Sequence, residues 1–212
     1  TEIIRKNKDK INEKDLANGI FEYLYNNFPD SNRHRLTLQY RMHPRIGTLI
    51  SHVFYGDEIQ NGIDRTERVL SIKGYENIAI EWISTSMRGD GERREIVTGA
   101  KNKETYQNNL ERNIIKEKLK ELDESLEVKT SVAVITGYSA QRYLLSNMVK
   151  QQVYKNIEVD VDTVDAFQGS QKEIIIYSTV RSSENPYGIG FLKSEARLNV
   201  AFSRAKCLLI IV

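Results

Sequence analysis

The sequence has little of several features that mark other classes of protein. Cys207 is the one cysteine among 212 residues, so no internal disulfide forms, and we expect a reducing compartment, the cytoplasm. No apolar run reaches the roughly 18 residues that a membrane-spanning helix needs, and the first residues do not resemble a secretory signal, so we expect no membrane partner. The three histidines lack an HExxH pattern or cysteine pairs, so no metal site is predicted.

Two signatures of nucleotide binding are absent as well. No Gly-x-x-x-x-Gly-Lys-Ser/Thr loop occurs in the sequence, so there is no loop to cradle the phosphates of a nucleotide. No Asp-Glu pair follows an apolar strand, as a magnesium-binding Walker B element would.

Composition is that of an ordinary globular α/β domain. Hydrophobic residues make up 40% of the chain and charged residues 28%, and 212 residues are enough to bury one sizeable core. The net charge of +2 leaves any nucleic-acid surface to local clusters of basic side chains. Residues 190–206 form one such cluster, with Lys193, Arg197, Arg204 and Lys206 against Glu195.

Apolar strands alternate with helices along the chain. Helical spacing predicts helices over residues 16–28, 44–54, 105–126 and 140–152, and apolar runs predict strands over 35–39, 78–83, 131–136, 158–164, 173–180 and 207–212. This order predicts a doubly wound, mainly parallel α/β sheet with helices on both faces. We expect one domain over 15–212, a flexible interdomain remnant over 1–14 and a mobile surface loop over 87–103.

Ligands of such sheets bind beyond the carboxyl ends of the strands. We therefore expect residues 40–41, 136–138 and 168–169 to meet at that edge of the sheet.

The run RLNVAFSRAK at residues 197–206 has the most informative pattern. Arg197 and Arg204 are seven residues apart, so on a helix two turns bring them to one face. Leu198, Phe202 and Ala205 would form an apolar stripe on a neighbouring face. Guanidinium groups fixed on a rigid element suit phosphate, although the same pattern fits the solvated basic face of an ordinary amphipathic helix.

Four segments together resemble superfamily 1 helicases. QYRMHP at 39–44, TVDAFQG at 163–169 and RLNVAFSRAK at 197–206 follow the order of motifs IV, V and VI, and residues 134–141 resemble the TPY-x-x-Q segment. The nearest resemblance is to the branch of the nonsense-mediated-decay RNA helicase and its DNA-helicase relatives. It implies a RecA-like domain of P-loop NTPase type, the second of two motor domains. The first motor domain, with the phosphate loop and the Mg²⁺ ligands, would precede residue 1 in the same polypeptide.

The resemblance implies roles at an ATP site shared between the two domains. Arg41 and Arg204 match arginine fingers, which stabilise negative charge on the γ-phosphate during transfer. Tyr40 matches a ring that stacks on adenine, and Gln168 a glutamine that contacts the γ-phosphate or the attacking water. Gly169 would let the backbone approach the nucleotide closely. The arginines also fit surface ion pairs, and Tyr40 also fits a core tyrosine.

Some positions depart from the family pattern or allow two interpretations. Gln171 stands where the family has a glutamate that accepts hydrogen bonds from the ribose, and an amide oxygen accepts them without charge. Gly137 stands where proline is usual. Arg197 fits either the nucleotide site or a tie to a neighbouring carboxylate. Residues 105–111 resemble a Ser-x-x-Asn-x-x-Glu pattern, which we interpret as a helix cap.

The resemblance also implies that this domain holds the backbone of a single strand of nucleic acid. Thr136, Tyr138 and Thr163 match the family positions, with Gln141 and Arg181 as further candidates. Hydroxyl and amide groups bind phosphate without reading sequence. Alternatively, the two threonines merely end their strands.

Together these features imply half of an ATP-dependent DNA or RNA helicase, a nucleoside-triphosphatase that uses ATP with Mg²⁺ and is inactive as this fragment alone. Two alternatives are a non-catalytic module that binds nucleic acid or a partner and keeps a vestigial half-site, and an unrelated parallel-sheet enzyme. The retained arginines and Gln168 favour the motor, because a passive module needs no groups directed at a γ-phosphate.

Overall fold

The computed structural model describes residues 25, 27–100, 103–182 and 188–212. The chain divides into two units, Thr1–Leu36 and Thr37–Val212. The described part of the first unit contains one short 3-10 helix, η1 (Asp30–Asn32). The expected remnant over 1–14 lies outside the described residues, as does most of the expected helix over 16–28.

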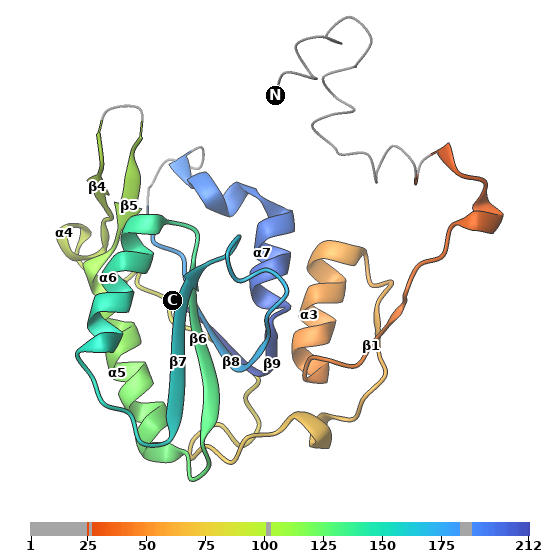
Figure 1. The fold of residues 1–212 in the computed structure, drawn as a ribbon, viewed down its shortest axis with the longest axis horizontal. Coiled ribbons are helices and arrows are strands. Elements are labelled where there is room, and N and C mark those ends of the chain that lie inside the picture. The colour runs from red at the N-terminus through yellow and green to blue at the C-terminus, as the bar shows by residue number, and fades with distance from the viewer. Residues whose placement is uncertain (1–24, 26, 101–102, 183–187) are drawn as a thin grey trace, which may run out of the picture. The chain divides into compact units, whose positions relative to one another are not determined.

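The second unit is built on a five-stranded sheet in which every neighbouring pair is parallel (Figure 1). The strand order is β3-β9-β8-β6-β7. The strands are β3 (Ile80–Trp82), β6 (Thr130–Thr136), β7 (Ile157–Thr163), β8 (Lys172–Ser178) and β9 (Ala205–Ile211). The predicted parallel α/β sheet is thereby confirmed.

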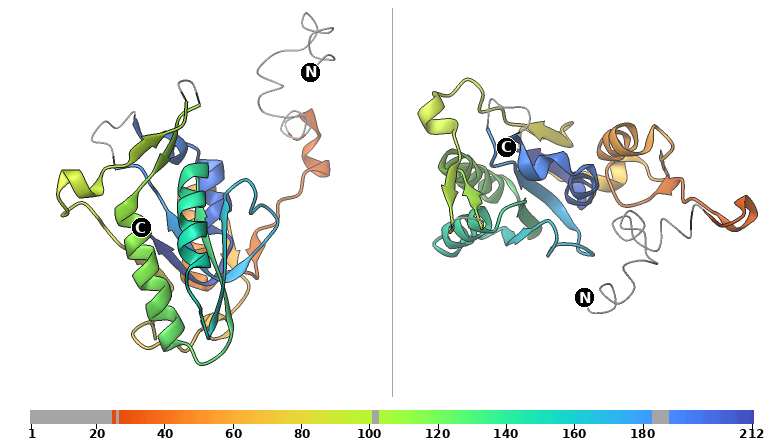
Figure 2. Two further views of the ribbon diagram at one scale, coloured as in Figure 1. Left: turned by 60° about the vertical axis from the view of Figure 1, so that its left-hand side comes forward. Right: turned by 90° about the horizontal axis from the view of Figure 1, so that it is seen from above.

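Helices cover both faces of this sheet (Figures 1 and 2). Helices α5 (Asn109–Ser125) and α6 (Ser139–Lys150) pack against one face, and α3 (Pro44–Tyr55) and α7 (Glu195–Phe202) against the other. Successive strand residues alternate between the two cores, because side chains of a strand point to opposite faces in turn. In β8, for example, Ile174 and Ile176 join the core with α5, whereas Ile175 joins the core with α3. This arrangement confirms the predicted doubly wound fold of the RecA-like class.

Smaller elements flank the sheet. A parallel pair, β1 (Leu38–Gln39) and β2 (Gln60–Asn61), brackets α3 and is followed by the 3-10 helix η2 (Arg65–Arg68). An antiparallel pair, β4 (Ile96–Thr98) and β5 (Thr105–Gln107), follows the short helix α4 (Asp90–Arg93), and η4 (Gly190–Lys193) precedes α7. The stretch 87–103, expected as a loop, therefore contains a helix and a paired strand, and the expected helix over 105–126 begins only at Asn109.

The predicted helix that carries both Arg197 and Arg204 is wrong. Helix α7 ends at Phe202, a turn follows, and Ala205 already pairs with Lys172 of β8 as the first residue of β9. The amide of Lys172 donates to the carbonyl of Arg204 at 3.1 Å. The stabilisation from pairing with β8 therefore outweighs the local helical preference of this segment. Ala205 is buried, but it belongs to a strand and not to a helix.

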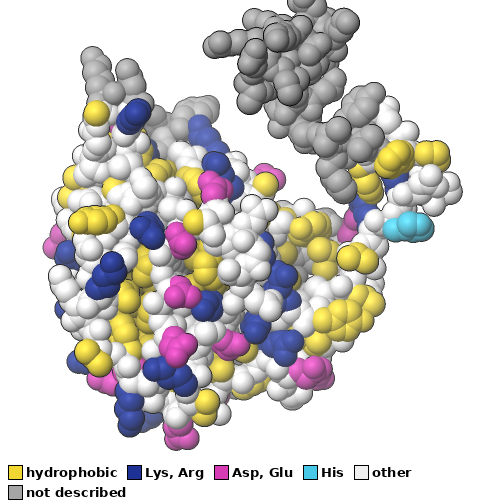
Figure 3. All heavy atoms as spheres, viewed as in Figure 1, with side chains coloured by type: hydrophobic (Ala, Val, Ile, Leu, Met, Phe, Trp, Pro, Cys, Tyr) yellow, Lys and Arg dark blue, Asp and Glu magenta, His cyan; other side chains and the backbone are white. Residues whose placement is uncertain are grey.

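Charges of both signs are interspersed over the face of the molecule that Figure 3 shows. Within the described residues, no helix is long and apolar enough to cross a membrane.

Candidate functional site

Arg41 and Arg204 approach each other although 163 positions separate them in the sequence. Arg41 Nη1 donates to the carbonyl of Ser203 at 3.3 Å, and Arg204 Nη1 donates to the carbonyl of Ser170 at 3.4 Å. Partial burial, together with the charge of Arg41, lowers the pKa of Arg204. In the described part of the chain, the buried Nε of Arg204 has no hydrogen-bond partner. The two guanidinium groups thus concentrate positive charge and keep donor capacity, which suits an anion.

These arginines lie at the amino ends of β8 and β9, so the expectation that residues 40–41 and 168–169 lie beyond the carboxyl ends is wrong. Arg204 directly precedes β9, and residues 168–171 directly precede β8. The His43 amide donates to the carbonyl of Lys206 at 2.6 Å, which ties the turn after β1 to the same end. The reason is topological: residues 164–171 must run back along the sheet before β8 can start parallel to β7.

Residues 168–171 are exposed, among them the predicted site residues Gln168, Gly169 and Gln171. Gly169 has φ +92°, a backbone conformation that L-residues with a side chain rarely adopt. A Cβ added there would meet no atom within 4 Å. Glycine is therefore required by the backbone turn itself. Its close approach to a nucleotide stays a prediction, as do the roles of the two glutamines.

The side chain of Tyr40 is 58% exposed, so it is not a core tyrosine. Its ring lies against Gly62, where an added Cβ would come within 2.4 Å of ring carbon Cε1. Gly62 thus supports the ring while more than half of the side chain remains accessible. This arrangement suits a surface on which a planar base stacks.

Arg197 has a carboxylate partner in the structure. Its Nε lies 3.2 Å from Asp165 Oδ1 and its Nη2 lies 3.3 Å from Oδ2. The guanidinium carbon also lies 4.9 Å from the centroid of the Phe191 ring. The structure thus contains the expected ion pair between Arg197 and a neighbouring carboxylate. This ion pair links α7 to the segment between β7 and β8. Its predicted contact with the nucleotide stays a prediction.

A second group of predicted residues lies at the carboxyl ends of the strands. Thr136 ends β6 and Thr163 ends β7, and the register pairs Thr136 with both Thr163 and Ser178. Thr136 is fully buried, whereas Thr163 is partly exposed and its hydroxyl accepts from the amide of Ala166 at 3.4 Å. In this conformation only the second threonine presents surface to a strand of nucleic acid.

Tyr138 lies just beyond β6 and is half-buried. Its hydroxyl accepts from the amide of Phe191 at 3.0 Å, and its ring meets that of Tyr106 edge to face at 5.3 Å. Gly137 packs against the Phe191 ring, since a Cβ there would come within 2.4 Å of it. A proline at position 137 would therefore clash unless this ring moved.

The two further nucleic-acid candidates are engaged with other protein groups. Gln141 is fully buried, accepts from the amide of Asn108 at 2.8 Å, and donates to Ser178 Oγ at 3.0 Å. Arg181 forms an ion pair with Glu95 at 2.9 Å, and its guanidinium lies 4.1 Å from the centroid of the Tyr106 ring. Both side chains hold the carboxyl end of the sheet together, and their contact with a strand stays a prediction.

Glu111 is a buried residue whose role sequence reasoning missed. Its carboxylate is 2% exposed and accepts from the hydroxyls of Ser178 and Thr179 and from the amide of Val180. Burial raises the pKa of Glu111 to about 7. The predicted helix cap is confirmed, because Asn108 Oδ1 accepts from the Glu111 amide at 3.1 Å. The Glu111 carboxylate, however, reaches strand β8 instead of returning to the cap, and no local pattern signals that contact.

The parallel sheet covered by helices on both faces is consistent with a RecA-like domain, and two arginines converge at its amino edge. Residues 16–212 match the family described as AAA domain, so the chain belongs to this family, the C-terminal part of Upf1-like superfamily 1 helicases. The resemblance noted from the motifs is thereby confirmed.

Three relatives illustrate the similarity. The chain is 35% identical over 182 residues to "Regulator of nonsense transcripts 1 homolog" of Neurospora crassa, covering 84% of this chain and 16% of that protein. It is 35% identical over 190 residues to "ATP-dependent helicase upf1" of Schizosaccharomyces pombe, covering 81% and 18%. It is 33% identical over 181 residues to "Probable helicase senataxin" of Mus musculus, covering 84% and 6%. The chain spans less than a fifth of each of these relatives, and it is part of an Upf1-like helicase motor region.

Proposed function

We propose that the chain is the second motor domain of an ATP-dependent helicase and completes an ATP site together with a first motor domain of the same polypeptide. The observation that carries this proposal is the convergence of Arg41 and Arg204, with an unpartnered buried donor on Arg204. The name of one relative, an ATP-dependent helicase, supports the reaction class. Relatives named as regulators of nonsense transcripts support a nucleic-acid substrate.

The donor set at the amino edge of the sheet fits a triphosphate. Guanidinium groups bind phosphate oxygens through planar, charge-assisted hydrogen bonds and do not ligate cations. ATP supplies the phosphoanhydride bond that is broken, and we propose that its Mg²⁺ is held by carboxylates of the first motor domain. In the described residues, no group of three or more His, Cys, Asp or Glu side chains lies together as a metal site would.

Five of the predicted residues then have distinct tasks. Arg41 and Arg204 donate to the γ-phosphate oxygens, on which negative charge accumulates in the transition state, and this lowers the barrier. Tyr40 supports the base by stacking, and Gln171 accepts from a ribose hydroxyl. Gln168 orients the attacking water.

We propose that the carboxyl ends of the strands hold a single strand of nucleic acid, DNA or RNA. Thr163 and Tyr138 are the candidates that present surface there. Thr136 and Gln141 act from the core, by fixing the ends of the strands that carry them. We propose that the protein works in the cytoplasm.

The test is the Arg204→Ala variant of the polypeptide with both motor domains, compared with Arg197→Ala. Losing an arginine finger should lower kcat by about 10³-fold with little change in KM, because the contact strengthens mainly in the transition state. Arg197 is bound to Asp165, so its loss should change kcat by less than about tenfold. Steady-state ATPase kinetics with single strands present measure both. If Arg204→Ala turns over ATP at the wild-type rate, the catalytic assignment of Arg204 fails, and the alternative of a non-catalytic binding module is favoured instead.

A further inference from the structure

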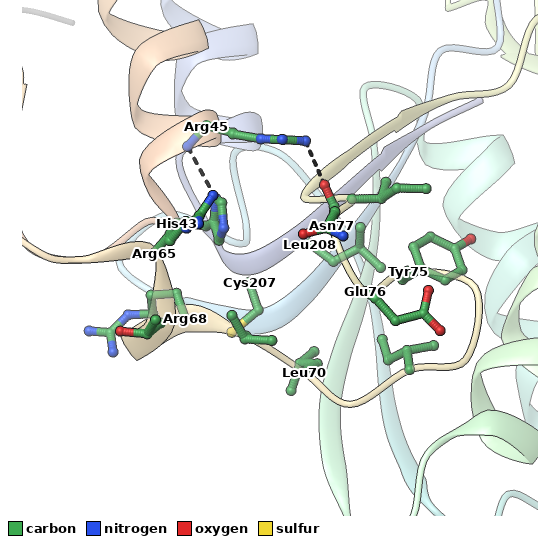
Figure 4. A pocket seen from close by; sticks show the side chains of 14 residues that line it. His43, Arg45, Arg65, Arg68, Leu70, Tyr75, Glu76, Asn77, Cys207 and Leu208 are labelled. Atoms are coloured by element: carbon green, nitrogen blue, oxygen red, sulfur yellow. Dashed lines mark hydrogen bonds between the residues drawn. The ribbon is translucent and has the colours of Figure 1, made fainter.

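A cavity of about 220 Å³ is lined by His43, which lies two residues after Arg41 in the sequence (Figure 4). Arg45, Arg65 and Arg68 line it, together with apolar side chains such as Leu70 and Leu208. Three arginines suggest an anion site, but two of them already donate to backbone carbonyls. Arg45 Nη1 donates to the carbonyl of Asn77 at 2.5 Å, as the dashed line in Figure 4 shows.

Arg68 makes the most consequential of these contacts. Its Nε donates to the carbonyl of Arg41 at 2.8 Å, and its Nη2 donates to the carbonyl of Tyr40 at 2.9 Å. Its Nη1 donates to the carbonyl of Glu67 at 3.0 Å. A planar guanidinium that binds two successive carbonyls fixes the orientation of the peptide between them, which a single hydrogen bond does not.

Gln39 holds the same turn from its other side. Its Oε1 accepts from the amides of Arg41 at 3.0 Å and Met42 at 2.8 Å, and its Nε2 donates to the carbonyl of Met42 at 3.0 Å. Between them, Gln39 and Arg68 bind two amides and three carbonyls of the segment 40–42. The backbone that presents the Tyr40 ring and the Arg41 guanidinium is thus fixed in place.

Local structure explains why Arg68 reaches this turn. Parallel pairing of β1 with β2 brings the chain back alongside the turn, and the amide of Gly62 donates to the carbonyl of Gln39 at 2.9 Å. Helix η2 then begins with a capping box, in which Asp64 accepts from the Thr66 amide and Glu67 accepts from the Asp64 amide. Arg68 is the last residue of this helix, so its side chain is carried by a capped turn.

We propose that Arg68 is a positioning residue of the nucleotide half-site. It holds the peptide between Tyr40 and Arg41 so that the ring lies on Gly62 and the Arg41 guanidinium lies near Arg204. This inference rests on the proposed function, because it assigns Arg68 an effect on nucleotide that passes through Tyr40 and Arg41. A lysine at position 68 would keep the charge, but a single ammonium group cannot place two donors in the fixed plane that the two carbonyls require.

The experiment is a mutant cycle on the polypeptide with both motor domains, read out as affinity for a fluorescent ATP analogue. Arg68→Ala should weaken binding about tenfold in the wild-type background and less than about twofold when Tyr40 and Arg41 are both alanine. Arg68→Lys should fall between the wild type and Arg68→Ala. Arg65→Ala is the matched control, because Arg65 begins the same short helix and its side chain is exposed. The affinity of this variant for the ATP analogue should equal that of the wild type.

The possible results separate the proposals. Equal losses from Arg68→Ala in both backgrounds would mean that Arg68 acts on the fold as a whole and would overturn the positioning role. Full recovery by Arg68→Lys would overturn it as well, because charge alone would then suffice. If Arg68→Ala does not fold, Arg68→Lys replaces it in the mutant cycle, and its affinity is measured in both the wild-type and the double-alanine background. If Tyr40→Ala and Arg41→Ala themselves leave nucleotide affinity and turnover unchanged, the proposed function fails, irrespective of Arg68.

Discussion

The carboxylate of Glu111, at the start of α5, accepts a hydrogen bond of 2.8 Å from the backbone amide of Val180, just beyond β8. Val180 has φ +69°, a left-handed conformation that is costly for a β-branched residue. It is also fully buried, so its amide has no access to solvent. The Glu111 carboxylate satisfies this amide and thereby stabilises the strained exit of β8, next to Arg181.

The stability of the fold should therefore depend on pH through Glu111. Burial raises its pKa from the ordinary 4.5 to about 7. Between these values the folded chain keeps a proton that the unfolded chain has released, so stability falls as pH rises through this window. The loss amounts to about 3 kcal/mol at most. In Glu111→Gln, which keeps an acceptor oxygen and does not titrate, this loss should be absent.

Urea unfolding at about pH 5 and about pH 8 measures the effect. Glu158→Gln is the matched control, because Glu158 is an exposed carboxylate on β7 and should behave like the wild type. Equal pH dependence in the wild type and in Glu111→Gln would show that Glu111 is not the group that titrates.

Tyr40→Ala should raise the KM for ATP about tenfold and leave kcat nearly unchanged. In the proposed function the ring stacks on the base equally before and during the reaction, so its loss should weaken ground-state and transition-state binding alike. Tyr40→Phe keeps the ring that lies on Gly62 and should retain the wild-type KM. A large fall in kcat for Tyr40→Ala would instead indicate that the ring acts on the reacting phosphate.

Arg41→Ala combined with Arg204→Ala should cost less than the sum of the two single losses in the activation free energy. In the proposed function both groups act on one phosphate, and partial burial together with the charge of Arg41 lowers the pKa of Arg204. Each single variant should lower kcat by about 10³-fold. Steady-state kinetics on all four proteins, checked for folding by circular dichroism, give the coupling directly. Additive losses would mean that the two arginines act at separate sites.

The 212-residue chain by itself should hydrolyse ATP at no more than a trace rate, with or without single strands. It contains no phosphate-cradling Gly-x-x-x-x-Gly-Lys-Ser/Thr loop, so the nucleotide lacks its main phosphate contacts. Phosphate release by the purified chain is the measurement. Robust turnover stimulated by strands would overturn the half-site model.

The sheet was predictable from the sequence because its strands are local apolar runs, such as Ile174–Ile176, whose side chains are all buried. The site was predictable only in part. Spacing alone put Arg204 on a helix, since strand pairing between residues 172 and 205 leaves no local signal. The edge of the sheet at which residues 168–169 lie depends on how far the connection between β7 and β8 runs back along the sheet before β8 begins. The sequence of this connection does not indicate that distance. The contact of Glu111 with Val180 spans 69 positions and likewise leaves no local pattern.

The last prediction concerns Gln171, which is exposed just ahead of β8 and stands where the family pattern has glutamate. A carboxylate accepts a hydrogen bond from a ribose hydroxyl more strongly than an amide oxygen does, because its charge assists the bond. Gln171→Glu should therefore increase the preference for ATP over dATP, which lacks the 2′-hydroxyl, by about three- to tenfold in kcat/KM. Gln152→Glu adds the same charge at an exposed position after α6 and should leave the preference unchanged. Competition between ATP and dATP in the polypeptide with both motor domains measures the ratio. An unchanged ratio in Gln171→Glu would place this side chain away from the ribose.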